Sequence, residues 1–346
     1  MFLGVDVGSV STNLVLLNES GDLMGRLYLG TSGQPIRVVQ QGLSQLFTRW
    51  GGERICAVGT TGSGRQLADA LLGADVVKNE ITAHAVAAQR EVPGVKTVLE
   101  IGGQDSKLIL MRDGIVTDFA MNTVCAAGTG SFLDRQASRL QIPIDQMGDM
   151  ARRAIAPVHI AGRCAVFAES DMIHKQQTGM QTEDIVAGLC DALARNFLSN
   201  LAKGKALEPP VVFQGGVAKN SGMVSAFERA LGLPILVPEN CDVMGACGAA
   251  LLARAQWITN PKPSRFRGWR SFERNYAAKR LVCEGCANRC EIVEILSEDI
   301  RLACWGDRCG KWSIQQGKDS TPDEDLSQAP DRNQDMGKNL CRDTLQ

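Results

Sequence analysis

A short unit of strands and glycine-containing turns occurs twice in the chain, and this repeat limits the folds open to it. The first copy has strands at 2–5 and 13–17 and turns at Asp6-Val-Gly-Ser9 and Gly21-Asp22. The second copy has strands at 97–101, 107–111 and 115–119 and turns at Gly102-Gly-Gln-Asp105 and Asp113-Gly114. Internal repetition of such a strand–turn–strand unit indicates a duplicated fold.

The stretches outside the repeat favour helices, with three short strands between them. Apolar periodicity predicts helices at 35–49, 66–72, 81–89, 132–140, 144–153, 164–177, 182–202 and 243–256. Strands are predicted at 55–58, 210–213 and 234–237. We therefore predict an α/β protein with two lobes, at about 1–95 and 96–256.

Three glycine-rich turns are predicted to bind a nucleotide. Glycine lets the backbone approach a phosphate closely, and successive N–H groups form an anion nest. The first two turns would clamp phosphates, and Gln214–Asn220 would lie against the adenosine. The predicted nucleotide-binding residues are Asp6, Gly8, Ser9, Thr12, Gly102, Gly103, Gln104, Asp105, Gly128, Gly130, Gly215, Gly216, Lys219 and Asn220.

Two acidic residues in these turns are candidates for handling Mg²⁺ and water. Asp6 would hold Mg²⁺ through water, because this ion sheds its hydration shell reluctantly. Asp105, with Gln104 beside it, is the predicted catalytic residue, which positions Mg²⁺ or the attacking water. A turn-stabilising role is the alternative for Asp105.

Two cysteines stand in small-residue strings, each just before a stretch that can begin a helix. The strings are Cys125-Ala-Ala-Gly-Thr-Gly-Ser and Gly162-Arg-Cys164-Ala-Val-Phe-Ala. A sugar kinase has no need of a thiolate at either place, whereas an anionic iron–sulfur cluster gains from helix N-termini. The alternative is that both are buried small residues.

The C-terminal part differs in composition from the rest. Residues 257–282 are rich in Lys, Arg and Pro, which predicts a basic, solvated linker. Residues 283–312 carry five cysteines and are predicted to form a module that binds zinc or an iron–sulfur centre. These cysteines are Cys283, Cys286, Cys290, Cys304 and Cys309. Residues 313–346 are polar and are expected to be disordered.

Charge and hydropathy exclude several classes of partner. The formal net charge of -1 implies no bulk attraction to nucleic acid or membrane. No apolar run is long enough to span a bilayer, and Asp6 comes too early for a secretory signal. Twelve cysteines in such a chain suit metal ligation or burial in a reducing compartment. We therefore expect a cytoplasmic protein.

Taken together, these motifs resemble those of a known family. The chain resembles the ATPase activators of 2-hydroxyacyl-CoA dehydratases and the ATPase subunits of benzoyl-CoA reductases, within the acetate and sugar kinase/Hsp70/actin superfamily. The resemblance covers residues 1–256, and the two cysteine strings are its most specific part. The matching strings are Gly4–Ser9, Thr61–Arg65, Ile101–Asp105, Asn122–Asp134, Val166–Ser170, Gly215–Ala218 and Gly245–Ala250.

The resemblance implies duplicated actin-like (ribonuclease H-like) ATPase lobes and a homodimer. It implies one [4Fe–4S] cluster shared across the two-fold axis, held by Cys125 and Cys164 of each subunit. ATP binding and hydrolysis would change the angle between subunits and drive one electron to a partner dehydratase or reductase. Ferredoxin or flavodoxin would supply that electron.

Two other functions remain open, and the chain departs from the family pattern. A small-molecule kinase, for example for an amino sugar, would use the same frame without a cluster. A nucleotide-gated regulator or metal-cluster scaffold would bind ATP with negligible turnover. The departures are Asn13 where a lysine is common, Lys219 in the turn before the adenosine helix, and a region 257–346 that short activators lack.

Overall fold

The computed structural model describes residues 1–312, which fall into two units. The first unit is Met1–Tyr276 and the second begins at Ala277. The predicted polar tail at 313–346 lies outside the described residues. No helix in the described part of the chain is long and apolar enough to cross a membrane.

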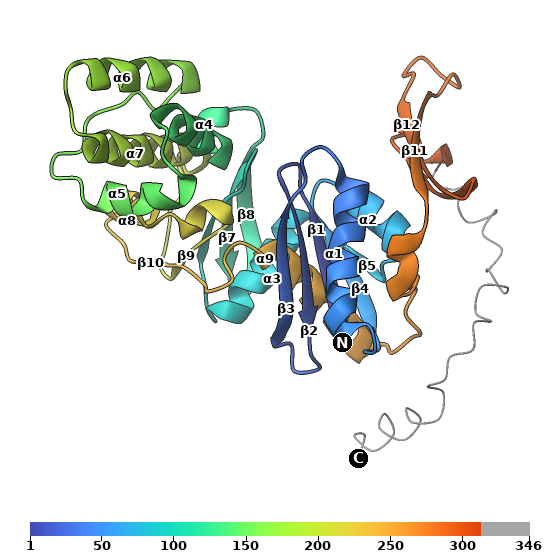
Figure 1. The fold of residues 1–346 in the computed structure, drawn as a ribbon. Coiled ribbons are helices and arrows are strands. Elements are labelled where there is room, and N and C mark those ends of the chain that lie inside the picture. The colour runs from blue at the N-terminus through green and yellow to red at the C-terminus, as the bar shows by residue number, and fades with distance from the viewer. Residues whose placement is uncertain (313–346) are drawn as a thin grey trace. The chain divides into compact units, whose positions relative to one another are not determined.

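The first lobe is a five-stranded sheet with the order β3-β2-β1-β4-β5 (Figure 1). Its strands are β1 (Phe2–Val7), β2 (Ser11–Leu17), β3 (Leu23–Gly30), β4 (Ala57–Thr61) and β5 (Val76–Val77). Its helices are α1 (Pro35–Trp50), α2 (Arg65–Leu72) and α3 (Glu80–Glu91). The strand β1 pairs antiparallel with β2 and parallel with β4.

The second lobe repeats this arrangement, with the sheet order β10-β9-β6-β7-β8. Its strands are β6 (Thr97–Ile101), β7 (Ser106–Arg112), β8 (Ile115–Asn122), β9 (Val211–Gln214) and β10 (Ile235–Leu236). The strand β6 pairs antiparallel with β7 and parallel with β9, as β1 does with β2 and β4. The duplication predicted from the two hairpin units is therefore confirmed.

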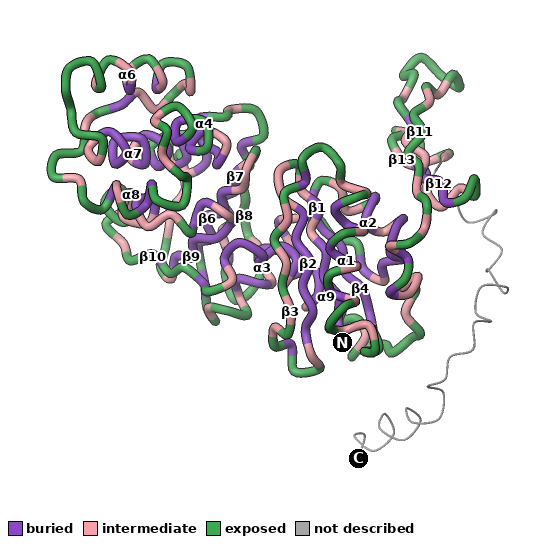
Figure 2. Tube along the Cα trace, in the orientation of Figure 1, coloured by how far each residue is buried: buried purple, intermediate pink, exposed green. Residues whose placement is uncertain are grey.

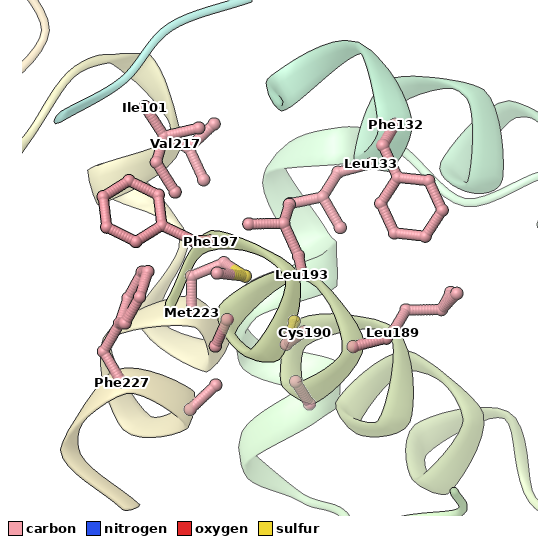
Figure 3. Close-up of a cluster of buried hydrophobic side chains, with 14 of the residues drawn as sticks. Ile101, Phe132, Leu133, Leu189, Cys190, Leu193, Phe197, Val217, Met223 and Phe227 are labelled. Atoms are coloured by element: carbon pink, nitrogen blue, oxygen red, sulfur yellow. The ribbon is translucent and has the colours of Figure 1, made fainter. Parts of the chain in front are cut away.

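Helices fill much of the second lobe. They are α4 (Gly130–Leu140), α5 (Met147–Arg152), α6 (Ala165–Gln177), α7 (Thr182–Leu201) and α8 (Ser221–Leu231), with the short 3₁₀ turns η1 (Ala126–Gly128), η2 (Ile144–Gln146) and η3 (Gly216–Lys219). The helix α7 is buried along most of its length (Figure 2). Figure 3 shows Phe197 and Leu193 of α7 at the centre of the core, with Phe227 of α8 edge-on to Phe197.

The helix α9 (Met244–Thr259) returns to the first lobe, where it packs on β1, β4 and α3. The helix approaches the strands so closely that a Cβ on Gly4 or Gly59 would lie 2.0 Å from a backbone oxygen of α9. Small residues on both sides are therefore required. The predicted second-lobe range of 96–256 is wrong in this respect, because its last helix belongs with the first sheet.

The segment predicted as a solvated linker, 257–282, is instead structured. It holds the end of α9, the turn η4 (Trp269–Glu273) and the strand β11 (Tyr276–Val282). Trp269 is buried, its indole N–H donates to the carbonyl of Glu53, and its ring packs near Phe47. The high content of Lys and Arg predicts a solvated segment, but the contacts of Trp269 hold the segment on the first lobe.

The second unit contains a three-stranded sheet with the order β11-β12-β13. Its other strands are β12 (Glu291–Ser297) and β13 (Ile300–Trp305), which pair antiparallel. Ile292, Ile295, Leu296 and Cys304 are its buried apolar residues.

Candidate functional site

A cavity of about 300 Å³ lies where the turns of the two sheets face each other. The predicted residues that line it are Asp6, Gly8, Ser9, Gly102, Gly103, Gln104, Asp105, Gly215 and Gly216. A second cavity of about 310 Å³ shares Gly102, Gly103 and Gly216 with the first. Gly130, Lys219 and Asn220 line the second cavity. The two cavities adjoin at their shared residues, and together their volumes are large enough for a ligand the size of a nucleotide.

Two predicted residues, Thr12 and Gly128, line neither cavity. Thr12 is fully buried, and its hydroxyl lies 2.9 Å from the hydroxyl of Thr31, which in turn donates to the carbonyl of Gly8. Thr12 therefore supports the turn at Gly8 from behind. Gly128 lies against Asn196, within the first cysteine string.

Asp6 lies one residue before the end of β1, and its carboxylate occupies space that Gly62 and Gly245 leave free. A Cβ on Gly62 would lie 2.5 Å from its Oδ1, and a Cβ on Gly245 would lie 2.1 Å from its Oδ2. Burial, and then the nearby carboxylate of Glu80, raise the pKa of Asp6 to about 7. A buried carboxylate in a cavity wall favours a compensating cation, and oxygen donors are what Mg²⁺ prefers. The residues present therefore fit the predicted Mg²⁺ site.

Lys107 lies two residues beyond Asp105 and is almost fully buried. Its ammonium nitrogen lies 2.7 Å from Glu80, 2.9 Å from Glu100 and 2.9 Å from Asp105. An ammonium group has three N–H donors, so these three carboxylates use all of them. Burial alone lowers the pKa of Lys107, but the facing carboxylates together raise it, so the residue stays charged. Lys107 therefore positions Asp105 in the cavity wall.

His84, which lines the first cavity, forms a buried polar pair with Gln214. The Nδ1 of His84 lies 2.8 Å from the Nε2 of Gln214. Burial, and then the charge of Lys107, lower the pKa of His84 to about 3. His84 is thus neutral in the folded protein near neutral pH.

We expect His84→Gln to make the fold less sensitive to acid. A histidine whose pKa is lowered on folding contributes stability above its unfolded pKa of 6.5, and this stability is lost as the pH falls toward about 3. As the pH falls between these two values, the free energy of unfolding of the native chain should drop by about 1.4 kcal/mol per pH unit relative to that of the variant. Urea unfolding at pH 7, 6 and 5 measures the difference, with the exposed His159→Gln as control. Parallel curves for native and His84→Gln would contradict this.

Cys125 and Cys164 stand at equivalent places, one before η1 and the other before α6. The Sγ of Cys125 lies 3.9 Å from the carbonyl oxygen of Arg163, so the two strings are in contact. Both thiols are half-buried. Neither thiol caps its helix, so both are free to bind something else at the positive end of a helix.

Asparagines hold the two cysteine strings in place. The side chain of Asn122 donates to the carbonyl of Cys125 at 2.9 Å and accepts from its N–H at 2.9 Å. From α7, Asn196 donates to the carbonyl of Gly162 at 2.6 Å, and its Oδ1 leaves room only for a glycine at 128. One helix therefore braces both strings.

The surface beside the two cysteines is apolar. Val124 is 95% exposed, Val166 is 68% exposed and Phe167 is 67% exposed. Large apolar side chains exposed together mark an interaction surface. Across residues 1–312, no three Cys, His, Asp or Glu side chains gather as a metal site. Two thiols beside an apolar surface fit half of a four-thiolate shell, which a second copy would complete.

The turn at Gly102–Asp105 and the first cysteine string are directly hydrogen-bonded. The N–H of Gly130 donates to the carbonyl of Gly102 at 2.8 Å, and the N–H of Ser131 donates to the carbonyl of Gly103 at 2.9 Å. The hydroxyl of Ser131 donates to the same Gly103 oxygen at 2.5 Å. These contacts fix the start of α4, five residues beyond Cys125, to the turn that carries Asp105.

The sequence analysis missed Lys107, Glu80, Glu100 and His84. A signal was present for two of them, because Glu100 and Lys107 are charged residues inside apolar strands, and they are cross-strand partners in β6 and β7. Charged residues in such positions are buried only when paired. Glu80 and His84 gave no local signal, since a helix with a glutamate and a histidine is ordinary.

Comparison with known proteins places this site in a family. Residues 3–253 match the model of the BadF/BadG/BcrA/BcrD ATPase family. The chain is 35% identical over 255 residues to the (R)-2-hydroxyglutaryl-CoA dehydratase activating ATPase of Acidaminococcus fermentans, with 72% of this chain and 96% of that protein covered. It is 37% identical over 259 residues to the activator of lactoyl-CoA dehydratase of Anaerotignum propionicum, with the same two coverages.

A solved structure agrees with the sequence matches. The activator of the 2-hydroxyisocaproyl-CoA dehydratase from Clostridium difficile, with bound ADPNP, aligns with a TM-score of 0.69 and 32% identity. The alignment covers 75% of this chain and 96% of that one. The predicted actin-like ATPase fold and the predicted family are confirmed, and the chain belongs to the BadF/BadG/BcrA/BcrD ATPase family.

Proposed function

We propose that the protein is an ATP-dependent one-electron donor that activates a partner 2-hydroxyacyl-CoA dehydratase or a related reductase. Ferredoxin or flavodoxin would supply its electron, and its place of action would be the cytoplasm. The activating ATPases among its relatives support this proposal. The observation that carries it is the set of hydrogen bonds between the Gly102–Asp105 turn and the start of α4, beside Cys125.

ATP would lie in the two cavities, with its phosphates between the turns of the two sheets. The backbone N–H of Gly103 would face the phosphates, because the N–H groups of Gly8 and Gly102 already donate to the carbonyls of Ser11 and Asp105. Asp6 would hold Mg²⁺ through water, and Asp105, oriented by Lys107, would position the ion or the attacking water. Gly216 and Asn220 would border the adenosine.

Cys125 and Cys164 of each subunit would hold one [4Fe–4S] cluster on the two-fold axis of a homodimer. Two half-buried thiols, two helix N-termini and the apolar surface of Val124, Val166 and Phe167 support this arrangement. When bound, the cluster supplies one-electron transfer. The protein's own part is to hold the four thiolates and to exclude water from them.

ATP would act on the cysteines through α4. Movement of the Gly102–Asp105 turn on hydrolysis pulls on the N–H groups of Gly130 and Ser131, and so on the string that carries Cys125. Arg135 and Arg139 of α4 also bind Glu169 of α6, at 3.0 and 2.8 Å, so the helix after Cys164 follows. Both cysteines would therefore respond to the nucleotide together.

We expect Ser131→Ala to weaken this coupling without preventing ATP binding. The variant removes the hydrogen bond from the hydroxyl to Gly103 but keeps the one from the backbone N–H. The loss of about 1 kcal/mol of coupling should lower the number of electrons delivered per ATP roughly fivefold. The readout is the ratio of electrons delivered to ATP hydrolysed, with Ser138→Ala, near the end of α4, as the matched control. An unchanged ratio in Ser131→Ala would rule out this route.

The small-molecule kinase of the same superfamily is the second candidate, but the cysteine strings and the activator relatives favour the electron donor. One assay separates the two. Reduced, anaerobic protein is mixed with Mg·ATP and a dehydratase component of the kind its relatives activate. The proposal predicts dehydratase activity with ATP and none with ADP. Phosphate transfer to an amino sugar, with no activation, would instead establish the kinase.

A further inference from the structure

The loop between β11 and β12 brings three cysteines to one end of the second unit's sheet. The N–H of Cys283 donates to the carbonyl of Cys290 at 2.8 Å, which closes the loop at its base. Inside it, the N–H of Arg289 donates to the carbonyl of Cys286 at 3.2 Å, and Arg289 has a φ of 43°. Cys283, Cys286 and Cys290 therefore belong to one closed hairpin loop.

Cys309 reaches the same end of the sheet from β13. The register of β12 and β13 ends with Val293 opposite Trp305, and Gly306 then lies against the start of β12. A Cβ on Gly306 would lie 2.2 Å from the carbonyl oxygen of Glu291, and its φ of +112° also requires glycine. The chain thus turns beside the cysteine loop, three residues before Cys309.

Trp312 and Asp307 join Cys309 to Cys283. The side chain of Trp312 is hydrogen-bonded to the sulfur of Cys283, and its backbone N–H donates to Asp307 Oδ2 at 3.1 Å. The thiol of Cys309 donates to the same oxygen at 3.6 Å. The backbone N–H of Gly285 also faces the sulfur of Cys283, at 3.5 Å. Trp312 and Asp307 therefore bring the chain around Cys309 next to the sulfur of Cys283.

The fifth cysteine of the unit has a different environment. Cys304 lies within β13 opposite Glu294 and is 2% exposed. It is one of the few buried apolar residues of the sheet, together with Ile292 and Ile295. Burial raises the pKa of its thiol, which keeps it protonated. Cys304 is therefore a core residue.

We infer that Cys283, Cys286, Cys290 and Cys309 form a closed four-thiolate site for one zinc ion. Four thiolates in two groups match the tetrahedral shell of structural zinc. A sheet of three strands with so small a core also needs a further source of stability. The four thiols do not converge in the part of the chain that the structure describes, so binding requires their side chains to rotate. Exposure of Cys286 and Cys309 allows this.

This site is independent of the proposed ATP-driven function, because it lies outside residues 3–253, which match the ATPase family. The test therefore uses the full chain carrying Cys125→Ala and Cys164→Ala, so that iron at those cysteines does not contribute. After anaerobic purification, zinc, iron and acid-labile sulfide are measured. The expected content is about one zinc per chain, without sulfide. Replacement by Co²⁺ should give the intense visible absorption of tetrahedral cobalt thiolate.

Single variants then assign the ligands. Each of Cys283→Ser, Cys286→Ser, Cys290→Ser and Cys309→Ser should remove most of the zinc, whereas Cys304→Ala should keep it. ADP binding verifies that the first unit of each variant is folded. The Co²⁺ spectrum is recorded on the chain with all four of these cysteines present, so it does not depend on whether the variants fold. Absence of zinc after reconstitution with Zn²⁺ under reducing conditions would overturn the proposal. So would iron with sulfide, or zinc retained in Cys309→Ser and lost in Cys304→Ala.

Discussion

Replacing either Cys125 or Cys164 by serine is expected to remove essentially all iron from anaerobically purified protein. Each subunit offers two thiols, so one substitution takes two of the four ligands from a cluster on the two-fold axis. The proposed dimer should hold about four irons and four sulfides. Iron and sulfide assays, with the dimer fraction measured by sedimentation, test both parts.

Cys56→Ser is the matched control for that experiment, because Cys56 is half-buried in the first lobe and takes no part in the proposed site. It should retain the iron of the native protein. Iron that survives in Cys125→Ser/Cys164→Ser would mean that the cluster is held elsewhere in the chain. ATP binding should be preserved in both serine variants, since neither cysteine lines a nucleotide cavity.

Lys107→Met is expected to cost the fold about 3–5 kcal/mol, because it leaves buried carboxylates without their cation. Glu100 and Glu80 are largely buried, and both face the Lys107 ammonium. ATP turnover should also fall, by about 10²-fold, because Asp105 loses the group that orients it. Urea unfolding and steady-state ATP hydrolysis are the two measurements.

Two further variants make the Lys107 result specific. Lys96→Met breaks the exposed Lys96–Glu208 pair and should leave stability unchanged. Glu100→Gln placed on top of Lys107→Met should restore part of the lost stability, because it removes one uncompensated buried charge. If Lys107→Met unfolds at the same urea concentration as the native chain, Lys107 does not neutralise the buried carboxylates of Glu80 and Glu100.

Much of the fold could be predicted because its signals are local. The repeated strand–turn–strand pattern depends on residues a few positions apart, and it gave both sheets and the turns that line the cavity. The turns after Asp6 and at Gly102–Asp105 are predictable because a glycine that follows an apolar strand commonly marks a turn. The family resemblance added the actin-like fold.

The remaining features depend on contacts between distant residues. Lys107 meets Glu80 only because α3 packs beside β7, and α9 joins the first sheet from the far end of the chain. The charged residues around Trp269 predict a linker, because the pattern does not show that the segment's aromatic side chains meet Phe47 of α1. The contact between the Cys125 and Arg163 strings likewise arises only in the folded chain.

The measurement that tests the central claim most directly is EPR of the reduced, anaerobic dimer during turnover. Protein is reduced with dithionite, freed of excess reductant and mixed with a one-electron acceptor dye, with Mg·ATP or with Mg·ADP. The account predicts a cluster signal that is lost markedly faster with ATP, in step with hydrolysis. A signal that decays at the same rate with both nucleotides, or anaerobic protein that hydrolyses ATP without any iron, would contradict it.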